Sequence, residues 1–511
     1  MEIADISLIG SGIAGTLTLI EVLDKLLNSP LRTKKLTVTV IEKNPEFWKG
    51  IPYGARSSIN ALTITNIQEF IYETERPLFF EWLKSNKNDW ISYYREHGGT
   101  TAESWLKNNL PFIENEEWEN IYIPRFLFGN YLSQKFMHLL KTAEEKQLVE
   151  IKLVRAEAID IQLKAGGLHE IMIEYADNTI SKVISRKVVV ATGSAPVKNM
   201  WGNAGNKEMY INDIYEPSVS DNLNIVLANL KNTNETGGRN ILIIGSNASC
   251  IELLYLIQGM TEFRDLINKI VIISASGELP YYTSTEILPD HPIPNLDKVK
   301  DSGDYTIEKL VEGAERDIAL AMQNGAHMDY VATIIGQTIS LMEVLDEESK
   351  KLFFGIYAIR LHNMFRRAGP EYRKAAQLFI DFQKLIMIKG TFLNIRSSEK
   401  GNFLNYLDIK TAQERTYPLN FMSVINCSGS ADLENSSSRL LFNLVNNTIC
   451  RMNLSRKGFE VNEKFEAAPN IYVMGPLLGG NVNKLIHFWQ LENAARLTYL
   501  APYLADELLN I

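Results

Sequence analysis

A short apolar run that leads into a glycine-rich turn opens the chain. Residues 5–15 read Asp-Ile-Ser-Leu-Ile-Gly-Ser-Gly-Ile-Ala-Gly. A longer stretch with a helical pattern follows, and the apolar run Leu36–Ile41 then ends on Glu42. Short apolar runs bounded by glycine or polar residues are typical of buried strands. The first 45 residues therefore predict a strand, a helix and a second strand, which is a βαβ unit.

The next part of the chain alternates irregular and periodic stretches. Residues 46–120 carry many aromatic side chains, which favours either a wall of a cofactor pocket or a local helical excursion with its own small core. Residues 122–147 have the spacing of an amphipathic helix, and strand-like runs follow at 149–163 and 168–175. The apolar strand Lys187–Ala191 ends in Ala-Thr-Gly, a small turn that permits a close crossing of chain segments.

A second strand–turn–helix pattern begins after a polar stretch. Residues 220–240 are rich in Asn, Lys, Thr and Gly and predict a loop or linker. Asn240–Ile244 is an apolar strand, residues 245–250 form a turn, and a helix and the strand Lys269–Ser274 follow. This order predicts a second βαβ unit. Its turn resembles the turn of the first unit but contains fewer glycines.

The last part of the chain is first helical and then returns to strands. Apolar residues recur with helical spacing from about residue 305 to 385, in a segment that also carries several arginines. Strand patterns return at 421–429 and at Asn470–Gly480, and a long helix is expected from about 484 to 509. Strands that alternate with helices indicate an α/β protein.

Composition and charge narrow the class of protein. With 511 residues, two or three domains are expected. The net charge of −9 gives no electrostatic reason to expect nucleic acid or an anionic membrane surface as a partner. No apolar stretch is long enough to span a bilayer, and the acidic residues Glu2 and Asp5 stand where a signal peptide would carry basic ones. We therefore expect a cytoplasmic protein without a membrane partner.

Cysteine and histidine usage argues against metal and thiol chemistry. Cys250, Cys427 and Cys450 stand far apart, and the seven histidines are scattered singly. No spacing suits a metal site or a redox pair of cysteines. We expect no metal, and the sequence excludes the flavin disulfide reductases, which need two neighbouring cysteines.

The opening turn has the pattern G-x-G-x-x-G, which indicates dinucleotide binding when a strand precedes it and a helix follows. In this pattern Gly10 makes the tight turn, Gly12 lets the backbone approach the pyrophosphate, and Gly15 lets helix and strand pack closely. The pyrophosphate would lie on the amide groups of the helix N-terminus, and Glu42 would accept the ribose hydroxyls. The alternative is a glycine-rich turn without a ligand.

The second turn departs from this pattern. Asn247 and Ser249 stand where the second and third glycines are usual. Asparagine tolerates a positive φ better than most residues, so Asn247 is compatible with the turn, although its side chain crowds a diphosphate. The following strand ends in Ser274-Ala275-Ser276-Gly277, without an arginine for the 2′-phosphate of NADP or an acid that would favour NAD. NADPH and NADH both stay open, and the alternative is a degenerate unit that binds no nucleotide.

The order of these motifs resembles that of the two-dinucleotide-binding-domain flavoproteins. The two glycine turns are interleaved with Ala191-Thr192-Gly193 and Ile425–Gly429, and Asn470–Pro476 follows near the end. Further segments resemble the FAD–NAD(P)-binding proteins that include amino-acid N-hydroxylases and are related to the class B flavin monooxygenases. These segments are Gly50–Gly54, Asn60–Asn66, Ile123–Leu132 and Tyr210–Tyr215.

The resemblance implies an α/β fold in which a Rossmann-like FAD-binding domain carries an inserted Rossmann-like NAD(P)-binding domain and a helical insertion. Residues 1–205 would form the first part of the FAD-binding domain, 206–300 the NAD(P)-binding domain, 301–390 the helical insertion, and 391–511 the return to the FAD-binding domain. The implied cofactors are FAD and either NADPH or NADH.

The resemblance also implies the residues of both nucleotide sites. The FAD site would contain Gly10, Ser11, Gly12, Ile13, Ala14, Gly15, Glu42, Lys43, Ile51, Pro52, Tyr53, Arg125, Thr192, Gly193, Gly475, Gly479 and Gly480. The NAD(P) site would contain Gly245, Ser246, Asn247, Ser249, Glu252, Ser274 and Ser276. The last three glycines of the first set would flank the isoalloxazine end of the cofactor.

The implied function is an FAD- and NAD(P)H-dependent monooxygenase that N-hydroxylates a small amine or amino acid with dioxygen, through a C4a-hydroperoxyflavin. This chemistry needs a dry pocket and no nucleophile–base pair, and the sequence identifies no catalytic residue. Tyr53 and His487 are substrate-site candidates because they lie near flavin motifs along the chain, and Arg360 and Arg366 are candidates because they suit an anionic substrate. A structural histidine and a solvated basic helix face are the alternatives.

Two other functions stay open at this point. The unusual glycine pattern at 245–250 favours an FAD-dependent oxidase or dehydrogenase with a vestigial nicotinamide site. A non-catalytic flavin-binding partner protein is compatible with every residue. The oligomeric state does not follow from the sequence.

Overall fold

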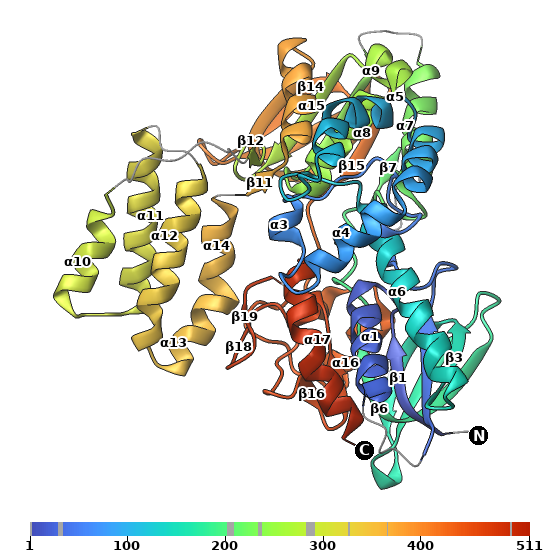
Figure 1. The fold of residues 1–511 in the computed structure, drawn as a ribbon. Coiled ribbons are helices and arrows are strands. Elements are labelled where there is room, and N and C mark those ends of the chain that lie inside the picture. Colours follow the sequence, from blue (N-terminus) through green and yellow to red (C-terminus); the bar gives the residue numbers. More distant parts are fainter. Residues whose placement is uncertain are drawn as a thin grey trace.

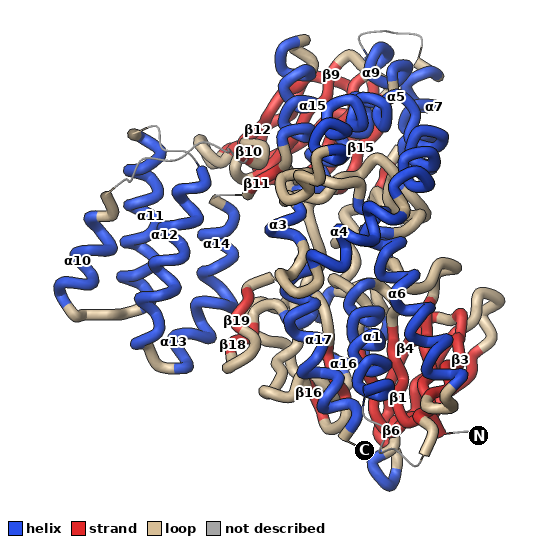
Figure 2. Tube along the Cα trace, in the orientation of Figure 1, coloured by secondary structure: helices blue, strands red, loops and turns tan. Residues whose placement is uncertain are grey.

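Three lobes make up the computed structural model of the chain (Figure 1). The structure describes residues 3–28, 34–201, 209–233, 238–282, 292–324, 328–364, 366–490 and 493–510. Two lobes contain a sheet with helices packed on it, and the third is a bundle of helices (Figure 2). The fold class is therefore α/β with a helical insertion, as the sequence predicted.

The first sheet contains the parallel run β17-β6-β1-β2-β3. These strands are β1 (Ile3–Ile9), β2 (Leu36–Glu42), β3 (Val149–Arg155), β6 (Ile180–Val190) and β17 (Ile471–Val473). The antiparallel strands are β4 (Glu157–Leu163), β5 (His169–Glu174) and β16 (Glu466–Ala468). α1 (Ile13–Asn28) packs against α6 (Arg125–Glu145) and α17 (Ala494–Leu509), and α16 (Arg439–Asn446) packs against β4. Segments from both ends of the chain thus build one domain.

The central strands are apolar on both faces because both faces are covered. Leu8, Val40 and Val189 have no exposed surface, and the helix α1 buries most of its residues against them. A parallel sheet between two helical layers has no solvated face, so its strands lack the alternation of polar and apolar residues. This is why the strands read as uninterrupted apolar runs.

Residues 46–120 are mainly helical, as in the expected helical excursion, but their buried side chains belong to the core of the sheet domains and not to a small core of their own. The helices are α2 (Gly50–Tyr53), α3 (Ile67–Phe70), α4 (Arg76–Ser85) and α5 (Lys87–Glu114). Their aromatic rings form a cluster with α6, in which Phe79 contacts Trp82, Phe128 and Tyr131. α5 reaches the second sheet domain, where the Thr100 hydroxyl donates to the Gly259 carbonyl oxygen (3.4 Å). The segment therefore connects the two sheet domains.

The second sheet has the order β14-β13-β12-β9-β8-β15-β7. Its strands are β7 (Tyr210–Ile211), β8 (Asn240–Ile244), β9 (Lys269–Ser274), β12 (Leu385–Ser398), β13 (Gly401–Asp408), β14 (Gln413–Asn420) and β15 (Ser423–Asn426). β13 pairs antiparallel with both β12 and β14, and the other neighbouring strands pair in parallel. The helices α7 (Val219–Lys231), α8 (Ala248–Gly259), α9 (Thr261–Leu266) and α15 (Pro370–Asp381) lie around this sheet (Figure 1).

The second domain extends further along the chain than we expected. Strands between residues 385 and 426 complete its sheet, and α15 packs against α8 and β12. The structure therefore places the return to the first domain after β15 and not at residue 391. The strands β12 to β14 are largely half-exposed or exposed, so their sequence pattern does not indicate the sheet that they join.

Residues 220–240 begin as a helix, although we expected a loop or linker. The Ser218 hydroxyl accepts the amide N–H of Asp221 and caps the helix α7. The buried apolar residues of α7 recur at intervals of three and four, as on the inner face of an amphipathic helix. They are Val219, Leu223, Val226 and Leu230. The polar composition that suggested a loop belongs to the solvated face of α7 and to the residues that follow it.

The helical lobe has a core of its own. Its helices are α10 (Pro294–Ser302), α11 (Ile307–Gln323), α12 (Met328–Leu341), α13 (Glu347–Leu352) and α14 (Ala358–Asn363). Their buried side chains form a cluster separate from the core of the sheet domains, and Val482 and Trp489 pack against this cluster. A short parallel pair of strands, β10 (Tyr281–Tyr282) and β11 (Arg367–Ala368), stands at the ends of the insertion.

A hairpin of the first domain contacts the helical lobe. Its strands are β18 (Asn481–Val482) and β19 (His487–Phe488). The hairpin occupies the start of the segment that we expected to be helical from residue 484, so α17 begins only at Ala494. Figure 1 shows the hairpin between α14 and α17.

Candidate functional site

The carboxyl ends of four parallel strands meet at one edge of the first sheet. Ile9 pairs with Ile41 of β2 and with Val190 of β6, and Val190 pairs with Val473 of β17. The first glycine turn, Glu42, the Ala-Thr-Gly turn and Gly475 therefore lie side by side. Open α/β sheets bind their ligands at this edge.

Gly10 and Gly15 are required by the fold itself. Gly10 has a φ of +92°, and a Cβ there would lie 2.5 Å from the carbonyl oxygen of Ala191. A Cβ on Gly15 would lie 2.5 Å from the carbonyl oxygen of Gly10. These distances leave no room for a side chain, so the tight turn and the close helix–strand packing that the motif predicts are both present.

Gly12 differs from these two glycines. Its φ is outside the left-handed region, and the nearest atom to a Cβ there is the Cα of Gly50, at an ordinary contact distance of 3.6 Å. The fold therefore leaves room for a small side chain. Gly12 stands directly before α1, whose first N–H groups have no acceptor within the helix. A glycine at this place suits a ligand that lies on those N–H groups.

Glu42 is held against the same turn. One carboxylate oxygen accepts the N–H (2.9 Å) and the hydroxyl (3.0 Å) of Ser11. The other accepts the N–H (2.9 Å) and the side-chain amide (3.0 Å) of Asn44. A carboxylate has about four acceptor positions, so these four bonds fix its orientation, and a ribose hydroxyl would have to take the place of one of the four donors. Lys43 and Thr192 are exposed at the same edge.

The other predicted FAD residues lie around this turn. Ile51 and Pro52 lie in α2, directly after Gly50. A Cβ on Gly475 would lie 3.1 Å from the Cβ of Ala14, so the end of β17 lies over the start of α1. The C-terminal return thus reaches the first nucleotide turn, as the resemblance implied.

The second glycine turn repeats the geometry of the first. Gly245 has a φ of +95°, and a Cβ there would lie 2.3 Å from the carbonyl oxygen of Cys427. Gly10 stands in the same relation to Ala191, so residues 427–429 are the counterpart of the Ala-Thr-Gly turn. In addition, β8 lies between β9 and β15 as β1 lies between β2 and β6. The second domain is therefore a structural repeat of the first.

Asn247 does not need the positive φ that we considered for it. Its φ is −88°, which is ordinary extended backbone. The side-chain oxygen accepts the N–H of Ser249 (3.1 Å) and caps α8. The cap engages one of the amide groups on which a diphosphate would lie. The turn itself is intact.

A group of hydroxyls lies at the end of β9. The Ser246 hydroxyl is 3.0 Å from that of Ser274, and both lie within hydrogen-bond distance of the Ser276 hydroxyl. Ser274 pairs with Lys389 of β12, and the backbone at Gly277 runs against the Lys389 side chain. Hydroxyls and an ammonium group are suitable donors for a phosphate.

Arg125 and Glu252, which we assigned to different nucleotide sites, pair with each other. Arg125 begins α6 and Glu252 lies in α8, and their charged groups are 2.7 Å apart with side-chain exposures of 13% and 3%. Glu252 also accepts the Tyr215 hydroxyl (3.1 Å), and Arg125 donates to the Ser57 hydroxyl (2.8 Å). Burial raises the pKa of Glu252, and Arg125 opposes this shift. The pair holds the two sheet domains together, a role that the sequence did not indicate.

Two of the predicted substrate residues have other surroundings. Tyr53 is buried, and its ring packs on Phe70 and Phe128 in the aromatic cluster. Arg360 is exposed and pairs with Glu315 inside the helical lobe (2.5 Å). Tyr53 is thus a packing residue in this structure, and the charge of Arg360 is balanced.

The other two predicted substrate residues are Arg366 and His487. Arg366 and Arg496 both help to lower the pKa of His362, and Arg496 also lowers the pKa of His487. We call these four residues, together with Phe488 and Trp489, the Arg366–Arg496 cluster. The guanidinium carbon of Arg496 lies 4.6 Å from the ring centre of Phe488 and 5.7 Å from that of Trp489. The His362 and Trp489 ring centres are 5.9 Å apart. The sequence reasoning missed Arg496, although it stands in the first turn of the helix that follows the last flavin motif.

His362 provides a pH-dependent signal from this cluster. Burial and three neighbouring arginines lower its pKa from 6.5 to about 4. Between these values the unfolded chain binds more protons at this residue than the folded protein, so stability rises with pH in this window and falls as the pH drops. We expect the His362→Gln variant to show a shallower loss of unfolding free energy between pH 6.5 and pH 4 in urea titrations. Parallel curves for variant and parent would contradict the assigned pKa.

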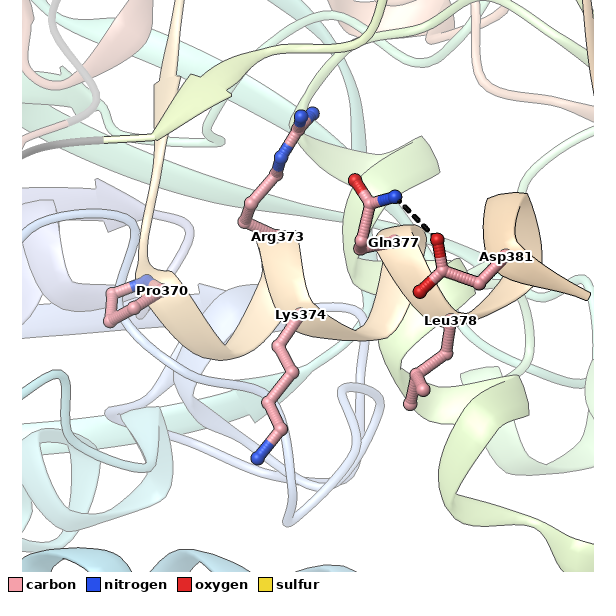
Figure 3. A pocket seen from close by; sticks show the side chains of 6 residues that line it. All are labelled: Pro370, Arg373, Lys374, Gln377, Leu378 and Asp381. Atoms are coloured by element: carbon pink, nitrogen blue, oxygen red, sulfur yellow. Dashed lines mark hydrogen bonds between the residues drawn. The ribbon is translucent and has the colours of Figure 1, made fainter.

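A shallow hollow on α15 is unrelated to the two sheet edges (Figure 3). Its lining side chains form one stripe along that helix, and Gln377 donates to Asp381 within it (2.7 Å). They are Pro370, Arg373, Lys374, Gln377, Leu378 and Asp381. Among the residues that the structure describes, every lining residue comes from this single helix, and we assign no function to the stripe.

Across the described ranges, no His, Cys, Asp and Glu side chains gather in a way that could hold a metal ion. In the same part of the chain, no helix has both the length and the hydropathy for a membrane crossing.

Comparison with known proteins places this geometry in a family. Residues 7–195 match the family model described as FAD-NAD(P)-binding. An uncharacterised protein of Mycobacterium tuberculosis is 34% identical over 511 residues, which covers 99% of this chain and 95% of the relative. A counterpart in Mycobacterium bovis matches to the same extent. The chain belongs to the family of these mycobacterial proteins, and its first domain is an FAD-NAD(P)-binding domain.

Several solved structures share the fold over the whole chain. The cadaverine monooxygenase of Erwinia amylovora, solved with FAD, has a TM-score of 0.59 at 11% identity and covers 100% of this chain and 95% of its own. The L-lysine 6-monooxygenase of Pseudomonas syringae has a TM-score of 0.54 at 15% identity, with 99% of both chains covered. The ornithine hydroxylase of Pseudomonas aeruginosa has a TM-score of 0.51 at 14% identity, again with 99% of both chains covered.

Proposed function

We propose that the protein is an FAD- and NADPH-dependent monooxygenase that N-hydroxylates a small amine. The observation that carries the proposal is the repeat of one glycine-turn geometry, at Gly10 and at Gly245, on two sheets of a single chain. Two such turns suit two dinucleotides, one for each domain. The solved structures with this fold include monooxygenases named for cadaverine and for lysine, which supports an amine as the substrate class.

The residues of the first site fit FAD. The N–H groups at the start of α1 would hold the pyrophosphate, and the oriented Glu42 carboxylate would accept the ribose hydroxyls. Gly475 would let the chain cross close to the cofactor, since its φ of +95° admits no ordinary side chain. When bound, FAD supplies the redox chemistry that activates dioxygen. The balanced reaction converts the amine, O₂, NADPH and a proton into the hydroxylamine, water and NADP⁺.

The surroundings of β9 support NADPH as the coenzyme. Ser274, Ser276 and Lys389 would donate to its 2′-phosphate, which NADH lacks. We expect the Lys389→Met variant to show a KM for NADPH raised about tenfold, or about 1.4 kcal/mol, with the KM for NADH unchanged. Steady-state NAD(P)H oxidation measures both, and Lys400→Met, on the exposed turn before β13, is the matched control. An equal change for both coenzymes would exclude this role of Lys389.

A product assay tests the proposed function. FAD-loaded enzyme is supplied with NADPH, air and a set of small amines, and hydroxylamine and hydrogen peroxide are both quantified. The proposal predicts an amine whose hydroxylated product accounts for most of the NADPH consumed. Hydrogen peroxide alone, with every amine, would count against it.

The second candidate is an FAD-dependent oxidase or dehydrogenase in which the nicotinamide site is vestigial. The Asn247 cap favours it, because that side chain engages an amide group of the second turn. If the protein is such an oxidase or dehydrogenase, the amine bleaches the flavin under nitrogen and NADPH does not. If it is a monooxygenase, NADPH bleaches the flavin under nitrogen and the amine does not.

A further inference from the structure

We propose that Asn453 and Asn481 are positioning residues of the flavin site, and that their side-chain amides help to set the midpoint potential of the bound FAD. Both amides hold one loop of the first domain, residues 475–480. This loop contains the three glycines that are expected beside the isoalloxazine end of FAD. The inference deepens the proposed function, because it rests on the flavin site of that function.

The loop of residues 475–480 begins at the sheet edge that carries the first nucleotide turn. It starts shortly after β17, and a Cβ on Gly475 would lie 3.1 Å from the Cβ of Ala14 in α1. Its middle, Pro476–Leu478, is a single turn of 3₁₀ helix, and the loop is buried apart from its proline. The backbone of the loop therefore lies next to the helix N-terminus on which the FAD pyrophosphate would rest.

Every carbonyl oxygen of residues 475–479 accepts a hydrogen bond from within the protein. The first two accept N–H groups of the same loop, at 3.0 Å each. The third accepts the N–H of Phe459 (2.9 Å). The fourth and fifth accept the side-chain amides of Asn481 (2.9 Å) and Asn453 (2.7 Å). None of these carbonyl groups therefore needs a partner from a cofactor.

The groups that the loop leaves for a ligand are N–H groups. Pro476 has no N–H, and among the residues that the structure describes no acceptor meets the N–H of Gly475 or of Leu477. A flavin gains negative charge when it is reduced, and N–H donors favour that charge while carbonyl oxygens oppose it. A carbonyl oxygen released toward the isoalloxazine would therefore lower the midpoint potential. The two asparagines prevent this release.

The two amides are themselves fixed in orientation. Asn453 and Asn481 are only 9% and 6% exposed. The side-chain oxygen of Asn453 accepts the N–H (3.1 Å) and the hydroxyl (2.5 Å) of Ser455, and that of Asn481 accepts the N–H of Val461 (3.1 Å). Both amide nitrogens also donate to the Phe459 carbonyl oxygen, at 3.3 Å and 2.7 Å. Because donors occupy the oxygen end of each amide, its nitrogen end has to face the loop.

Gly458 offers a second way to move the same loop. The Asn453 N–H donates to the Gly458 carbonyl oxygen (3.0 Å). A Cβ on Gly458 would lie 2.5 Å from the carbonyl oxygen of Leu477 and 2.6 Å from that of Gly479. These are backbone atoms, so a side chain at this position would press on the carbonyl groups of the loop and leave both asparagines in place.

Substitutions that release or displace these carbonyl groups test the proposal. Asn453→Asp and Asn481→Asp keep the size and the acceptor oxygen of the side chain but replace its donor with a second oxygen. Gly458→Ala displaces the loop without a change in charge. In all three variants we expect the midpoint potential of the bound FAD to fall by at least about 30 mV, which is a tenfold weaker preference for the reduced flavin.

Asn483→Asp is the matched control. Asn483 lies in the β18–β19 hairpin, and its side-chain oxygen accepts the N–H groups of Leu485 (3.0 Å) and Ile486 (2.8 Å). A carboxylate keeps both bonds and adds the same charge as the other two aspartate variants, so the potential should stay at the parental value. A shift of the same size in this control, or a parental potential in the three test variants, overturns the proposal.

The choice of reductant separates this proposal from the proposed function. Titration of the FAD-loaded protein with dithionite and a reference dye needs neither NADPH nor an amine. If NADPH does not bleach the flavin but the three variants lower its potential, the proposed function fails and the positioning role stands. If NADPH bleaches the flavin and the variants keep the parental potential, only the positioning role fails. Failure of all three variants to fold or to bind FAD would mark these residues as structural and would also overturn the proposal.

Discussion

The Gly12→Ala variant is expected to fold normally and to lose FAD. The backbone at Gly12 is in a conformation that alanine adopts, and a Cβ there meets only Gly50, at 3.6 Å. The protein alone therefore accommodates the methyl group. The pyrophosphate would lie on the N–H groups of residues 12–14, and the added methyl group would stand in its path. We expect the dissociation constant for FAD to rise at least about tenfold, which is about 1.4 kcal/mol.

Two other glycines provide the controls for this experiment. Gly336 in α12 has open space around a Cβ, so Gly336→Ala should keep both the flavin and the stability. Gly10→Ala should lower the unfolding midpoint as well as the flavin content, because its Cβ would collide with the Ala191 carbonyl group. Flavin content after gel filtration and the unfolding midpoint of the ligand-free protein are the two readouts. A Gly12→Ala variant that binds FAD as tightly as the parent would contradict the assigned pyrophosphate position.

The Glu252→Gln variant is expected to lose about 3 kcal/mol of unfolding free energy, at the lower end of the range for a broken buried ion pair. The substitution keeps the shape of the side chain but leaves the Arg125 charge buried without its counterion. Because the pair joins α6 to α8, the loss should appear as weaker docking of the two sheet domains. Urea titration of the FAD-free protein measures it.

A solvent-exposed ion pair provides the comparison. Lys35 and Glu150 are 2.7 Å apart, with side chains 44% and 57% exposed, so Glu150→Gln should cost less than about 1 kcal/mol. The double variant Arg125→Met with Glu252→Leu should recover most of the loss, because packed apolar residues often replace a buried pair without penalty. Equal effects of Glu252→Gln and Glu150→Gln would mean that the buried pair does not stabilise the domain contact.

The strand–turn–helix units could be predicted from the sequence because their signals are local. The run Asp5–Gly15 contains the buried strand, the turn that needs a positive φ and the contact that needs a small residue. The helix α7 carried equally local signals in its Ser218 cap and its buried apolar stripe. We missed it because we gave more weight to its polar composition.

Contacts between distant segments could not be predicted in the same way. Arg125 and Glu252 each stand in a motif that resembles a nucleotide site, and only the packing of α6 on α8 makes them partners. The Arg366–Arg496 cluster combines the end of α14, the β18–β19 hairpin and the start of α17, which no single stretch of sequence brings together. Likewise, β12 to β14 join the second sheet through pairing between β9 and β12.

On the proposed function, NADPH reduces the flavin of this protein, and dioxygen is then used to hydroxylate an amine. The most direct measurement mixes FAD-loaded enzyme with NADPH under nitrogen and follows the visible flavin absorbance. Aerated buffer that contains a small amine, chosen from the product assay, is then added. We expect rapid bleaching by NADPH, followed by return of the colour with one hydroxylamine formed for each O₂ consumed. A flavin that neither NADPH nor NADH bleaches would contradict it.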